Sequence, residues 1–458
     1  MIESVLVANR GEIARRVIRT ARRLGIRAVA VYSEADAGLP YVAEADQAVP
    51  VGPANPAQSY RNTEAILAAA KATGAAAIHP GYGFLSENAA FARAVTGAGL
   101  VWVGPGPAAI EAMGDKINAR NLMAAAGVPV APGATDPVAD ADAAVAEAVR
   151  IGYPVMVKAA AGGGGMGMAP AFDEAALRAE YGRVTGFAAR MFGDAAVLVE
   201  RYYPRVRHIE VQILGWTAPD GTHRVVALGE RECSVQRRNQ KVLEETPSPA
   251  VSPELRQRLC AAAVRAGQAV GYRNAGTVEF LFDPTVPATG PSARDGDFFF
   301  LEMNTRLQVE HPITECVYRL DLVEEQFRVA SGLVPTFGEQ VPAAAGHAIE
   351  LRVNAEDPKR FLPGPGAITT WVEPSGEGVR VDAGYGPGTT VTPHYDSLMA
   401  KLIVSAPDRD TALARARAAV AGFGIAGPKC NLPFFAELLD RPEFTGGDYD
   451  TGIVARMR

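Results

Sequence analysis

The sequence lacks the features of several large protein classes. No apolar run is long enough to span a membrane, so we expect no membrane role. Basic residues are not in excess, since 45 Lys and Arg face 51 Asp and Glu, and the net charge of −6 argues against a general nucleic-acid binder. The 4 cysteines are widely separated and match neither a zinc pattern nor a disulfide framework. Met1 leads directly into a strand pattern, without a basic leader. We therefore expect a protein of the reducing cytoplasm.

The chain of 458 residues is too long for a single hydrophobic core and suggests two to four domains. Over roughly the first hundred residues, apolar strand patterns alternate with helical ones, beginning with a strand at Ser4–Asn9. This alternation predicts a doubly wound parallel α/β domain. Its first turn is not GxGxxG, so we predict no dinucleotide site there. One helix is predicted from Ala108 onward, and it contains Asp115 and Lys116.

A lysine followed by a glycine run marks the next region. Lys158 ends a strand pattern, and four consecutive glycines begin at Gly162. Such a segment can present backbone N–H groups and one cation to phosphates, although a flexible loop is the alternative. A Walker A motif is absent, because the lysine precedes the glycines. The following strand pattern at Ala196–Tyr203 suits a connection whose backbone pairs with an adenine edge.

Two later segments carry polar residues in strand patterns. Residues Arg207–Leu214 alternate polar and apolar side chains, which predicts a strand with one solvent-facing side, and His208 is either a site residue or a surface residue. The segment Glu230–Lys241 is rich in basic residues, which favours an anion contact over a solvated loop. Cys233 within it is interpreted as a packing residue rather than a nucleophile.

An unusual polar run follows a buried strand pattern near residue 300. After the apolar residues Phe298–Leu301, polar side chains occur at every second position, and residues two apart on a strand share one face. The alternating residues are Glu302, Asn304, Arg306, Gln308 and Glu310. We predict that they line one wall of a strand-like run that ends at His311-Pro312.

A second strand pattern carries Glu279 in the middle of an apolar run. If the two strands form a hairpin with Phe282 facing Phe299, Glu279 lies directly opposite Glu302. Two carboxylates held so close repel each other, and a divalent cation relieves that repulsion. Carboxylate and amide oxygens suit Mg²⁺ (or Mn²⁺), so we predict a magnesium site. The alternative is a buried salt bridge between the acids and Arg306.

The order of these motifs resembles that of the biotin carboxylases, the ATP-grasp components of biotin-dependent carboxylases. The resemblance runs from Ser4–Ile13 through the turn-rich segment His79–Asn88 to Tyr395–Ser397, and so covers nearly the whole chain. It implies an N-terminal α/β domain at 1–114, an ATP-grasp domain at 115–330 with a mobile lid at about 133–203, and a C-terminal mixed β/α domain at 331–446. The fold class is thus α/β and α+β, multidomain.

The resemblance also implies a reaction and roles for individual residues. MgATP and bicarbonate form carboxyphosphate, and the carboxyl group then passes to biotin. The phosphate and ribose contacts are Lys116, Lys158, Gly164, Gly165, His208 and Gln236, and the backbone from Glu200 to Tyr203 holds adenine. The metal ligands are Glu279, Glu302 and Asn304. Bicarbonate is bound by Lys241, Arg306, Gln308 and the Val309 backbone; Glu310 is the base, and Arg352 stabilises the biotin anion.

Some features depart from the family pattern or leave the biology open. Met166 and Ala161 stand in the glycine loop where a basic residue and a glycine are usual, and Asn239 replaces a common histidine. No biotin-attachment motif of the Ala-Met-Lys-Met type is present, so we expect a biotin carboxyl carrier protein as a separate chain or a further segment, together with a carboxyltransferase subunit. The final acceptor is an acyl-CoA or another compound. The family pattern favours a homodimer. The alternatives are another ATP-grasp carboxylate–amine ligase and a weakened ATP-binding scaffold subunit.

Overall fold

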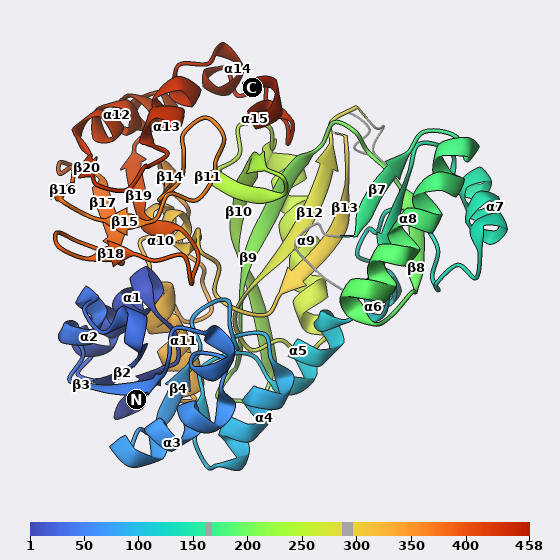
Figure 1. Cartoon of the computed structure of the whole chain (residues 1–458). Coiled ribbons are helices and arrows are strands. Elements are labelled where there is room, and N and C mark those ends of the chain that lie inside the picture. Colours follow the sequence, from blue (N-terminus) through green and yellow to red (C-terminus); the bar gives the residue numbers. More distant parts are fainter. Residues whose placement is uncertain (161–166, 286–295) are drawn as a thin grey trace.

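The first hundred residues form a five-stranded parallel sheet in the order β3-β2-β1-β4-β5 (Figure 1). The computed structural model describes residues 1–160, 167–285 and 296–458 of the chain. The strands are β1 Ser4–Val7, β2 Arg27–Ser33, β3 Gln47–Gly52, β4 Ala77–His79 and β5 Val101–Trp102. The helices are α1 Gly11–Arg23, α2 Pro40–Glu44, α3 Thr63–Thr73 and α4 Ala89–Gly97, with short 3₁₀ helices at Glu34–Asp36 and Pro56–Gln58. The predicted doubly wound α/β domain is confirmed.

Two helices, rather than one, connect this sheet to the next region. They are α5 (Pro107–Gly114) and α6 (Lys116–Ala125). Asp115 breaks the predicted single helix because its backbone is extended, with φ −94° and ψ 114°, and its side chain accepts a hydrogen bond of 2.8 Å from Asn118 N. Asp115 therefore caps α6, as aspartate favours, and Lys116 lies at the first position of that helix.

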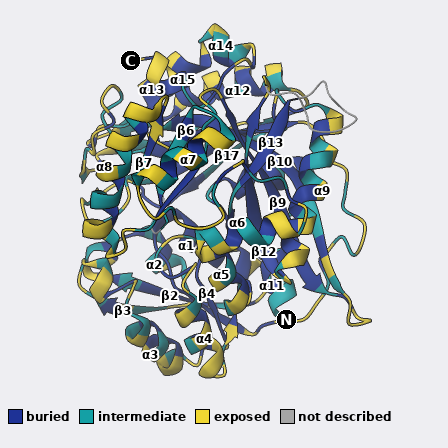
Figure 2. Ribbon diagram, turned by 90° about the vertical axis from the view of Figure 1, so that its right-hand side faces the viewer, coloured by how far each residue is buried: buried dark blue, intermediate teal, exposed yellow. Residues whose placement is uncertain are grey.

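One antiparallel sheet of eight strands extends through the middle of the molecule, in the order β13-β12-β9-β10-β11-β14-β19-β17 (Figure 1). Its strands are β9 Arg207–Thr217, β10 His223–Arg237, β11 Gln240–Thr246, β12 Asn274–Asp283, β13 Asp297–Asn304, β14 His347–Asn354, β17 Val379–Ala383 and β19 Leu398–Ala406. Strands β14, β17 and β19, all after residue 331, thus continue the sheet that carries the two acids. Figure 2 shows that most of this sheet is buried.

A smaller three-stranded sheet with two helices lies on the opposite side of the molecule from the C-terminal helices (Figure 1). The strands are β6 Val155–Ala159, β7 Met168–Ala171 and β8 Val197–Arg201, and the helices are α7 Ala141–Ile151 and α8 Glu174–Phe192. Alternate residues of β6 and β8 pack against these helices in a separate apolar cluster. The glycines Gly164 and Gly165, together with Ala161 and Met166, lie outside the described residues.

The remaining elements surround the large sheet. They are α9 Pro253–Ala269, α10 His311–Tyr318, α11 Leu322–Ala330, α12 Arg409–Gly422, α13 Leu432–Leu439, α14 Pro442–Thr445 and α15 Ile453–Arg456. Two short ribbons pair β15 Gly366–Ala367 with β18 Thr390–Val391, and β16 Thr370–Val372 with β20 Gly424–Ala426. Within the described ranges no helix has the length and apolarity needed to cross a membrane.

Candidate functional site

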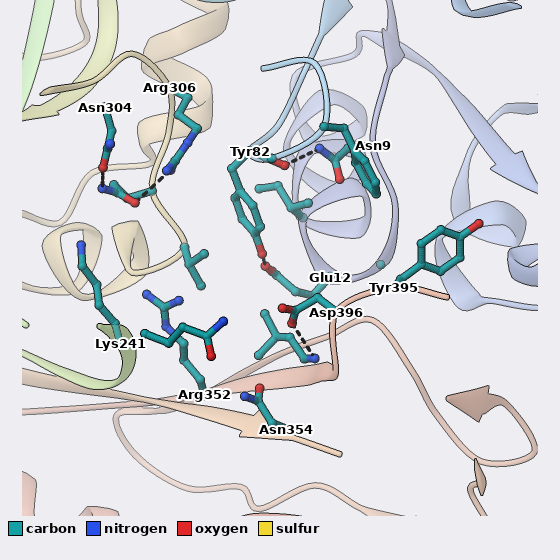
Figure 3. A pocket seen from close by; sticks show the side chains of 18 of the residues that line it. Asn9, Glu12, Tyr82, Lys241, Asn304, Arg306, Arg352, Asn354, Tyr395 and Asp396 are labelled. Carbon is teal, nitrogen blue, oxygen red and sulfur yellow. Dashed lines mark hydrogen bonds between the residues drawn. The ribbon is translucent and has the colours of Figure 1, made fainter. Parts of the chain in front are cut away.

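A cleft of about 700 Å³ lies where the N-terminal sheet, the large sheet and the C-terminal strands meet (Figure 3). Its walls include the turn after β1, the loop before α4, and residues of β9, β11, β12, β13 and β14. The sequence-predicted site residues that line it are His208, Lys241, Glu279, Glu302, Asn304, Arg306, Gln308, Val309 and Arg352. Residues up to 144 positions apart in the chain, His208 and Arg352, therefore face one space.

The two predicted acids are neighbours, as expected. Glu279 on β12 lies directly opposite Glu302 on β13 in the antiparallel pairing. The predicted hairpin register is wrong by one residue at the other end, because Phe282 faces Phe298 and not Phe299. A bulge between Phe280 and Glu279 places one extra residue on β13 and so restores the pairing of the acids.

The polar run after Glu302 is not the continuous strand that its spacing predicts. β13 ends at Asn304, residues 305–310 form a loop, and His311 and Pro312 begin helix α10. Proline at the start of a helix is favourable because its missing N–H has no partner there in any case. The loop is held by side chains instead of strand pairing: the Gln308 amide donates to Asn304 Oδ1 and, at 2.9 Å, to Glu279 Oε1.

Lys241 is the central cation of the site. Its ammonium contacts a carboxylate oxygen of Glu210, lies 2.8 Å from Glu279 Oε1, and lies 2.7 Å from Glu310 Oε1. Burial alone would lower the pKa of Lys241, but these three carboxylates outweigh burial and hold that pKa well above its ordinary value. Lys241 is therefore a fixed positive charge at any physiological pH.

Glu310 lies beneath the cleft, fully buried, between two cations. Arg352 Nη2 lies 2.9 Å from Glu310 Oε2, opposite the contact with Lys241. Burial raises the pKa of Glu310, but Lys241 and Arg352 outweigh it and hold the pKa well below its ordinary value. Arg352 is itself held by Glu244, with 2.7 Å from Nε to Oε1, and burial raises the pKa of Glu244 to about 7.

The acid pair has the properties expected of a cation site. Burial, and then the charge of Glu279, raise the pKa of Glu302. The pKa of Glu279 is instead held well below its ordinary value, because Lys241 and His208 outweigh the effect of burial. Asn304 lies beside them, its amide 3.1 Å from Glu302 Oε1. Two carboxylates and an amide oxygen are a hard donor set, and their mutual repulsion is what a divalent cation would relieve. These residues fit Mg²⁺ or Mn²⁺.

Arg306 does not form the alternative salt bridge with the acid pair. Its Nε lies 2.9 Å from Glu87 Oε2, and Glu87 also accepts a hydrogen bond of 3.1 Å from Thr305 N. Glu87 belongs to the turn-rich segment after β4, which the sequence singled out without assigning it a partner. Another nitrogen of the same guanidinium, Arg306 Nη1, donates a hydrogen bond of 2.9 Å to Gln308 Oε1.

His208 and Gln236 adjoin the acid pair from the neighbouring strands. His208 Nε2 lies 2.7 Å from Glu279 Oε2, and Gln236 Nε2 lies 2.6 Å from His208 Nδ1. The Gln236 amide thus faces Nδ1 of the ring, and the Glu279 carboxylate faces Nε2. His208 is therefore a buried residue that lines the cleft, and not a surface residue.

The predicted solvent-facing side of β9 is wrong. Glu210 and Gln212 are both fully buried, because Arg231 of the adjacent strand β10 covers them. The Arg231 guanidinium contacts Glu210 and donates to Gln212 Oε1 at 2.8 Å and to Thr314 Oγ1 at 2.9 Å. Arg231 thus lies in the interior and contacts protein partners, whereas Lys241 of the same basic segment lines the cleft. An alternation of polar and apolar residues does not show whether the polar face contacts water or is covered by a buried cation.

Comparison with known proteins agrees with this geometry. Family models match along the chain: the biotin carboxylase N-terminal domain at residues 1–110, the ATP-binding domain of the carbamoyl-phosphate synthase L chain at 115–334, and the biotin carboxylase C-terminal domain at 350–456. Biotin carboxylase 2 of Bacillus subtilis is 47% identical over 454 residues, covering 99% of both chains. The chain belongs to the biotin carboxylase family.

Other relatives of the chain carry different names. One pyruvate carboxylase subunit, from Methanothermobacter thermautotrophicus, is 47% identical over 459 residues, covering 100% of this chain and 90% of the relative. The Campylobacter jejuni biotin carboxylase structure, an ATP complex, has a TM-score of 0.93 at 42% identity, covering 100% and 99% of the two chains. The biotin carboxylase domain dimer of Hydrogenobacter thermophilus 2-oxoglutarate carboxylase, with MgADP and bicarbonate, has a TM-score of 0.91 at 41% identity, covering 100% and 98%.

Apart from His208, the described nucleotide residues expected from biotin carboxylases are not part of the cleft lining. Lys158 on β6 contacts the carboxylate of Glu200 on β8. Burial, and then the charge of Lys158, lower the pKa of Lys116. The Tyr203 ring stacks on Phe299 with centroids 4.7 Å apart and an interplanar angle of 13°. Lys158 of the small sheet, Lys116 at the start of α6 and the Tyr203 ring thus lie near the acid strands.

Cys233 has the packing role expected from the sequence. Its thiol is fully buried, its Sγ lies 3.9 Å from Glu310 Oε1, and burial raises its pKa well above the ordinary value. A thiol that is held protonated is a poor nucleophile.

Proposed function

We propose that this chain catalyses the ATP- and bicarbonate-dependent carboxylation of biotin, which a separate carrier protein presents to it. One observation carries this conclusion: a buried carboxylate, Glu310, lies directly beneath the cleft between two cations that line it, Lys241 and Arg352, and the cleft also contains the acid pair. A carboxylate so placed serves as a base for a small anion that the same cations attract. Bicarbonate is such an anion.

Bicarbonate binding depends on cations that neutralise its charge before it meets the terminal phosphate of ATP. Lys241 and Arg306 supply that charge, and Gln308 and the Val309 backbone complete the site. Glu310 then removes the bicarbonate proton, because bicarbonate is a poor nucleophile until it is deprotonated. The resulting anion attacks the γ-phosphorus, forming the O–P bond of carboxyphosphate as the bond to ADP breaks.

The low pKa of Glu310 in the free site is consistent with this role. Lys241 and Arg352 both stabilise the ionised carboxylate, so Glu310 alone is a weak base. An arriving anion shares the same two cations and adds a negative charge nearby, and both effects raise the proton affinity of Glu310. The base thus becomes effective when its substrate is present.

The metal and nucleotide sites follow from neighbouring residues. Glu279, Glu302 and Asn304 would hold Mg²⁺ (or Mn²⁺), which when bound neutralises phosphate charge. Lys116 and Lys158 would contact phosphates, His208 and Gln236 the ribose, and the backbone from Glu200 to Tyr203 the adenine. The segment at about 133–203 would act as a lid over an ATP-grasp domain at 115–330, between domains at 1–114 and 331–446, and would exclude water from carboxyphosphate.

Arg352 would stabilise the biotin anion that accepts the carboxyl group. Glu244 anchors its guanidinium, leaving the cleft-facing side for the ureido oxygen. We further propose a biotin carboxyl carrier protein and a carboxyltransferase as partners, a homodimer, and a cytoplasmic location consistent with four free cysteines. The relatives include a pyruvate carboxylase subunit and a 2-oxoglutarate carboxylase domain. We therefore propose 2-oxo acids, as well as acyl-CoA, as candidates for the final carboxyl acceptor.

The test is ATP hydrolysis by the purified chain, with and without bicarbonate and free biotin. We expect hydrolysis that requires bicarbonate, increases with biotin, and transfers labelled bicarbonate carbon to biotin. Stimulation by an amine in place of biotin would favour an ATP-grasp carboxylate–amine ligase. ATP binding without any hydrolysis would favour a scaffold role. Either result would overturn the proposal.

A further inference from the structure

A single lysine interrupts the most apolar strand of the large sheet. Lys401 lies in the middle of β19, between Ala400 and Leu402, and its side chain has no solvent exposure. An ammonium group buried among apolar residues costs several kcal/mol unless partners compensate. In a strand that otherwise packs with the main core, this cost indicates that the charge has a specific use.

The ammonium of Lys401 joins three separate parts of the chain. Its Nζ donates a hydrogen bond of 2.9 Å to Val309 O, in the loop between β13 and α10. The same Nζ lies 3.1 Å from Glu12 Oε2, in the first turn of α1. Lys401 itself comes from the C-terminal strands, so one buried cation connects the N-terminal domain, the site loop and the C-terminal region.

The carbonyl that accepts this hydrogen bond lies directly before Glu310 in the loop. Val309 O belongs to the peptide group that joins Val309 to Glu310. Because a peptide group is planar, fixing this oxygen also fixes the direction in which the chain enters Glu310. On the other side of Val309 is the backbone N–H that is proposed to bind bicarbonate. Lys401 therefore acts on the segment between the proposed bicarbonate contact and the proposed base.

Glu12 contacts the Lys401 ammonium, and a residue of the cleft in turn contacts Glu12. The Tyr82 hydroxyl donates to Glu12 Oε1, and Tyr82 lines the cleft (Figure 3). Burial raises the pKa of Glu12, and Lys401 counteracts that effect. Tyr82, Glu12, Lys401 and Val309 thus form a continuous polar chain behind one wall of the site.

We propose that Lys401 is a positioning residue for bicarbonate: clamped by Glu12, it holds the Val309–Glu310 peptide so that the Val309 N–H and the Glu310 carboxylate face the same point of the cleft. This inference rests on the proposed function. Lys401 touches neither substrate nor reacting atoms, because its ammonium faces the far side of the loop. Its loss should weaken bicarbonate binding and leave nucleotide binding intact.

The experiment compares Lys401→Met and Lys401→Arg with the unmodified chain in bicarbonate-dependent ATP hydrolysis. Loss of one hydrogen bond to a charged donor lowers an equilibrium constant by about 10- to 100-fold. We therefore expect Lys401→Met to raise the KM for bicarbonate by about 10- to 100-fold. The KM for ATP should change less than about twofold, because Lys401 contacts none of the proposed nucleotide residues. Lys401→Arg keeps a cationic donor and should recover most of the bicarbonate affinity.

The matched control is Arg409→Met. Arg409 lies 2.7 Å from the buried Glu245, so this change also removes a cation from a buried glutamate, but far from the site loop. We expect it to lower stability while leaving both KM values unchanged. If Lys401→Met lowers stability just as much but leaves the KM for bicarbonate unaltered, Lys401 is only structural and the inference is wrong.

A second variant covers the case in which Lys401→Met does not fold. Glu12→Gln keeps a neutral acceptor for the ammonium and weakens the clamp, so the KM for bicarbonate should rise by about threefold or more, again without change in the KM for ATP. An equal rise in both KM values would contradict the inference. An unmodified chain without bicarbonate-dependent hydrolysis would instead overturn the proposed function itself, which separates the two failures.

Discussion

Replacing Glu310 with glutamine removes one negative charge and one proton acceptor while nearly preserving the size of the side chain. In the unmodified protein this carboxylate lies 2.7 Å from Lys241 Nζ and 2.9 Å from Arg352 Nη2. The amide can still accept one hydrogen bond, but it cannot take a proton from bicarbonate. We therefore expect Glu310→Gln to abolish most biotin-dependent turnover while MgATP still binds.

Two effects of Glu310→Gln can be estimated: the loss of turnover and the loss of stability. Loss of a general base typically slows a reaction by about 10²- to 10⁴-fold, and we expect that range for turnover. Breaking a buried ion pair often costs about 3–5 kcal/mol because the partner charge is left alone. Here Lys241 keeps Glu210 and Glu279, and Arg352 keeps Glu244, so we expect only about 1–2 kcal/mol of lost stability.

The assay measures labelled bicarbonate fixed on free biotin, together with MgATP affinity by calorimetry and unfolding by denaturant. Glu315→Gln is the control, because Glu315 is also a buried acid held by two arginines, at 2.6 Å from Arg16 and 2.8 Å from Arg380, and lies on the following helix α10 outside the cleft lining. The control should keep its turnover. A Glu310→Gln variant that retains more than about a tenth of normal turnover would remove Glu310 from the role of base.

Three further variants test other parts of the molecule. Glu279→Gln should raise the Mg²⁺ concentration needed for half-maximal ATP hydrolysis by about tenfold or more, and an unchanged Mg²⁺ titration would contradict the metal assignment. Glu245 is fully buried against His347 and Arg409; these contacts outweigh burial and lower its pKa from 4.5 to about 2, so its stabilisation is present above pH 4.5 and is lost as pH falls toward 2. Glu245→Gln should therefore cost about 3 kcal/mol of unfolding free energy at pH 7 and much less near pH 2, as denaturant titrations at several pH values would reveal. Glu350 is fully buried, neither of its carboxylate oxygens has a hydrogen-bond partner among the described residues, and burial raises its pKa well above the ordinary value. Because burial favours the protonated form of Glu350, Glu350→Gln should keep turnover within about twofold, whereas a large loss would show that its charge is needed.

The pairing of the two acids is predicted from an assumed hairpin in which Phe282 faces Phe299. The observed pairing of Phe282 with Phe298 would place Glu279 opposite Leu301 in a regular ladder. A bulge of one residue compensated for the error, and nothing local in the sequence indicates it. The prediction of the acid pair therefore depended on a register that holds at only one end of the hairpin.

The same spacing argument fails after Asn304 for a physical reason. Strand geometry continues only while a neighbouring strand supplies hydrogen bonds, and β13 has no pairing with β12 beyond Asn304. The loop that follows is instead shaped by Glu87, which comes from the N-terminal domain more than two hundred residues earlier. Such long-range contacts are invisible in local periodicity. The residue types of the loop indicate bicarbonate chemistry, but their arrangement requires the fold.

The arrangement of acids around the site explains how its cations can serve a substrate without being displaced. Lys241 has three carboxylate partners and Arg352 has two, yet they share only Glu310. If Glu310 takes up the bicarbonate proton as proposed, Glu210 and Glu279 still hold Lys241, and Glu244 still holds Arg352. The cations therefore need no reorganisation at the moment of reaction, which is the condition under which fixed charges stabilise a transition state most effectively. Burying this many carboxylates lowers stability. In return, the positions of Lys241 and Arg352 are the same whether Glu310 is ionised or protonated.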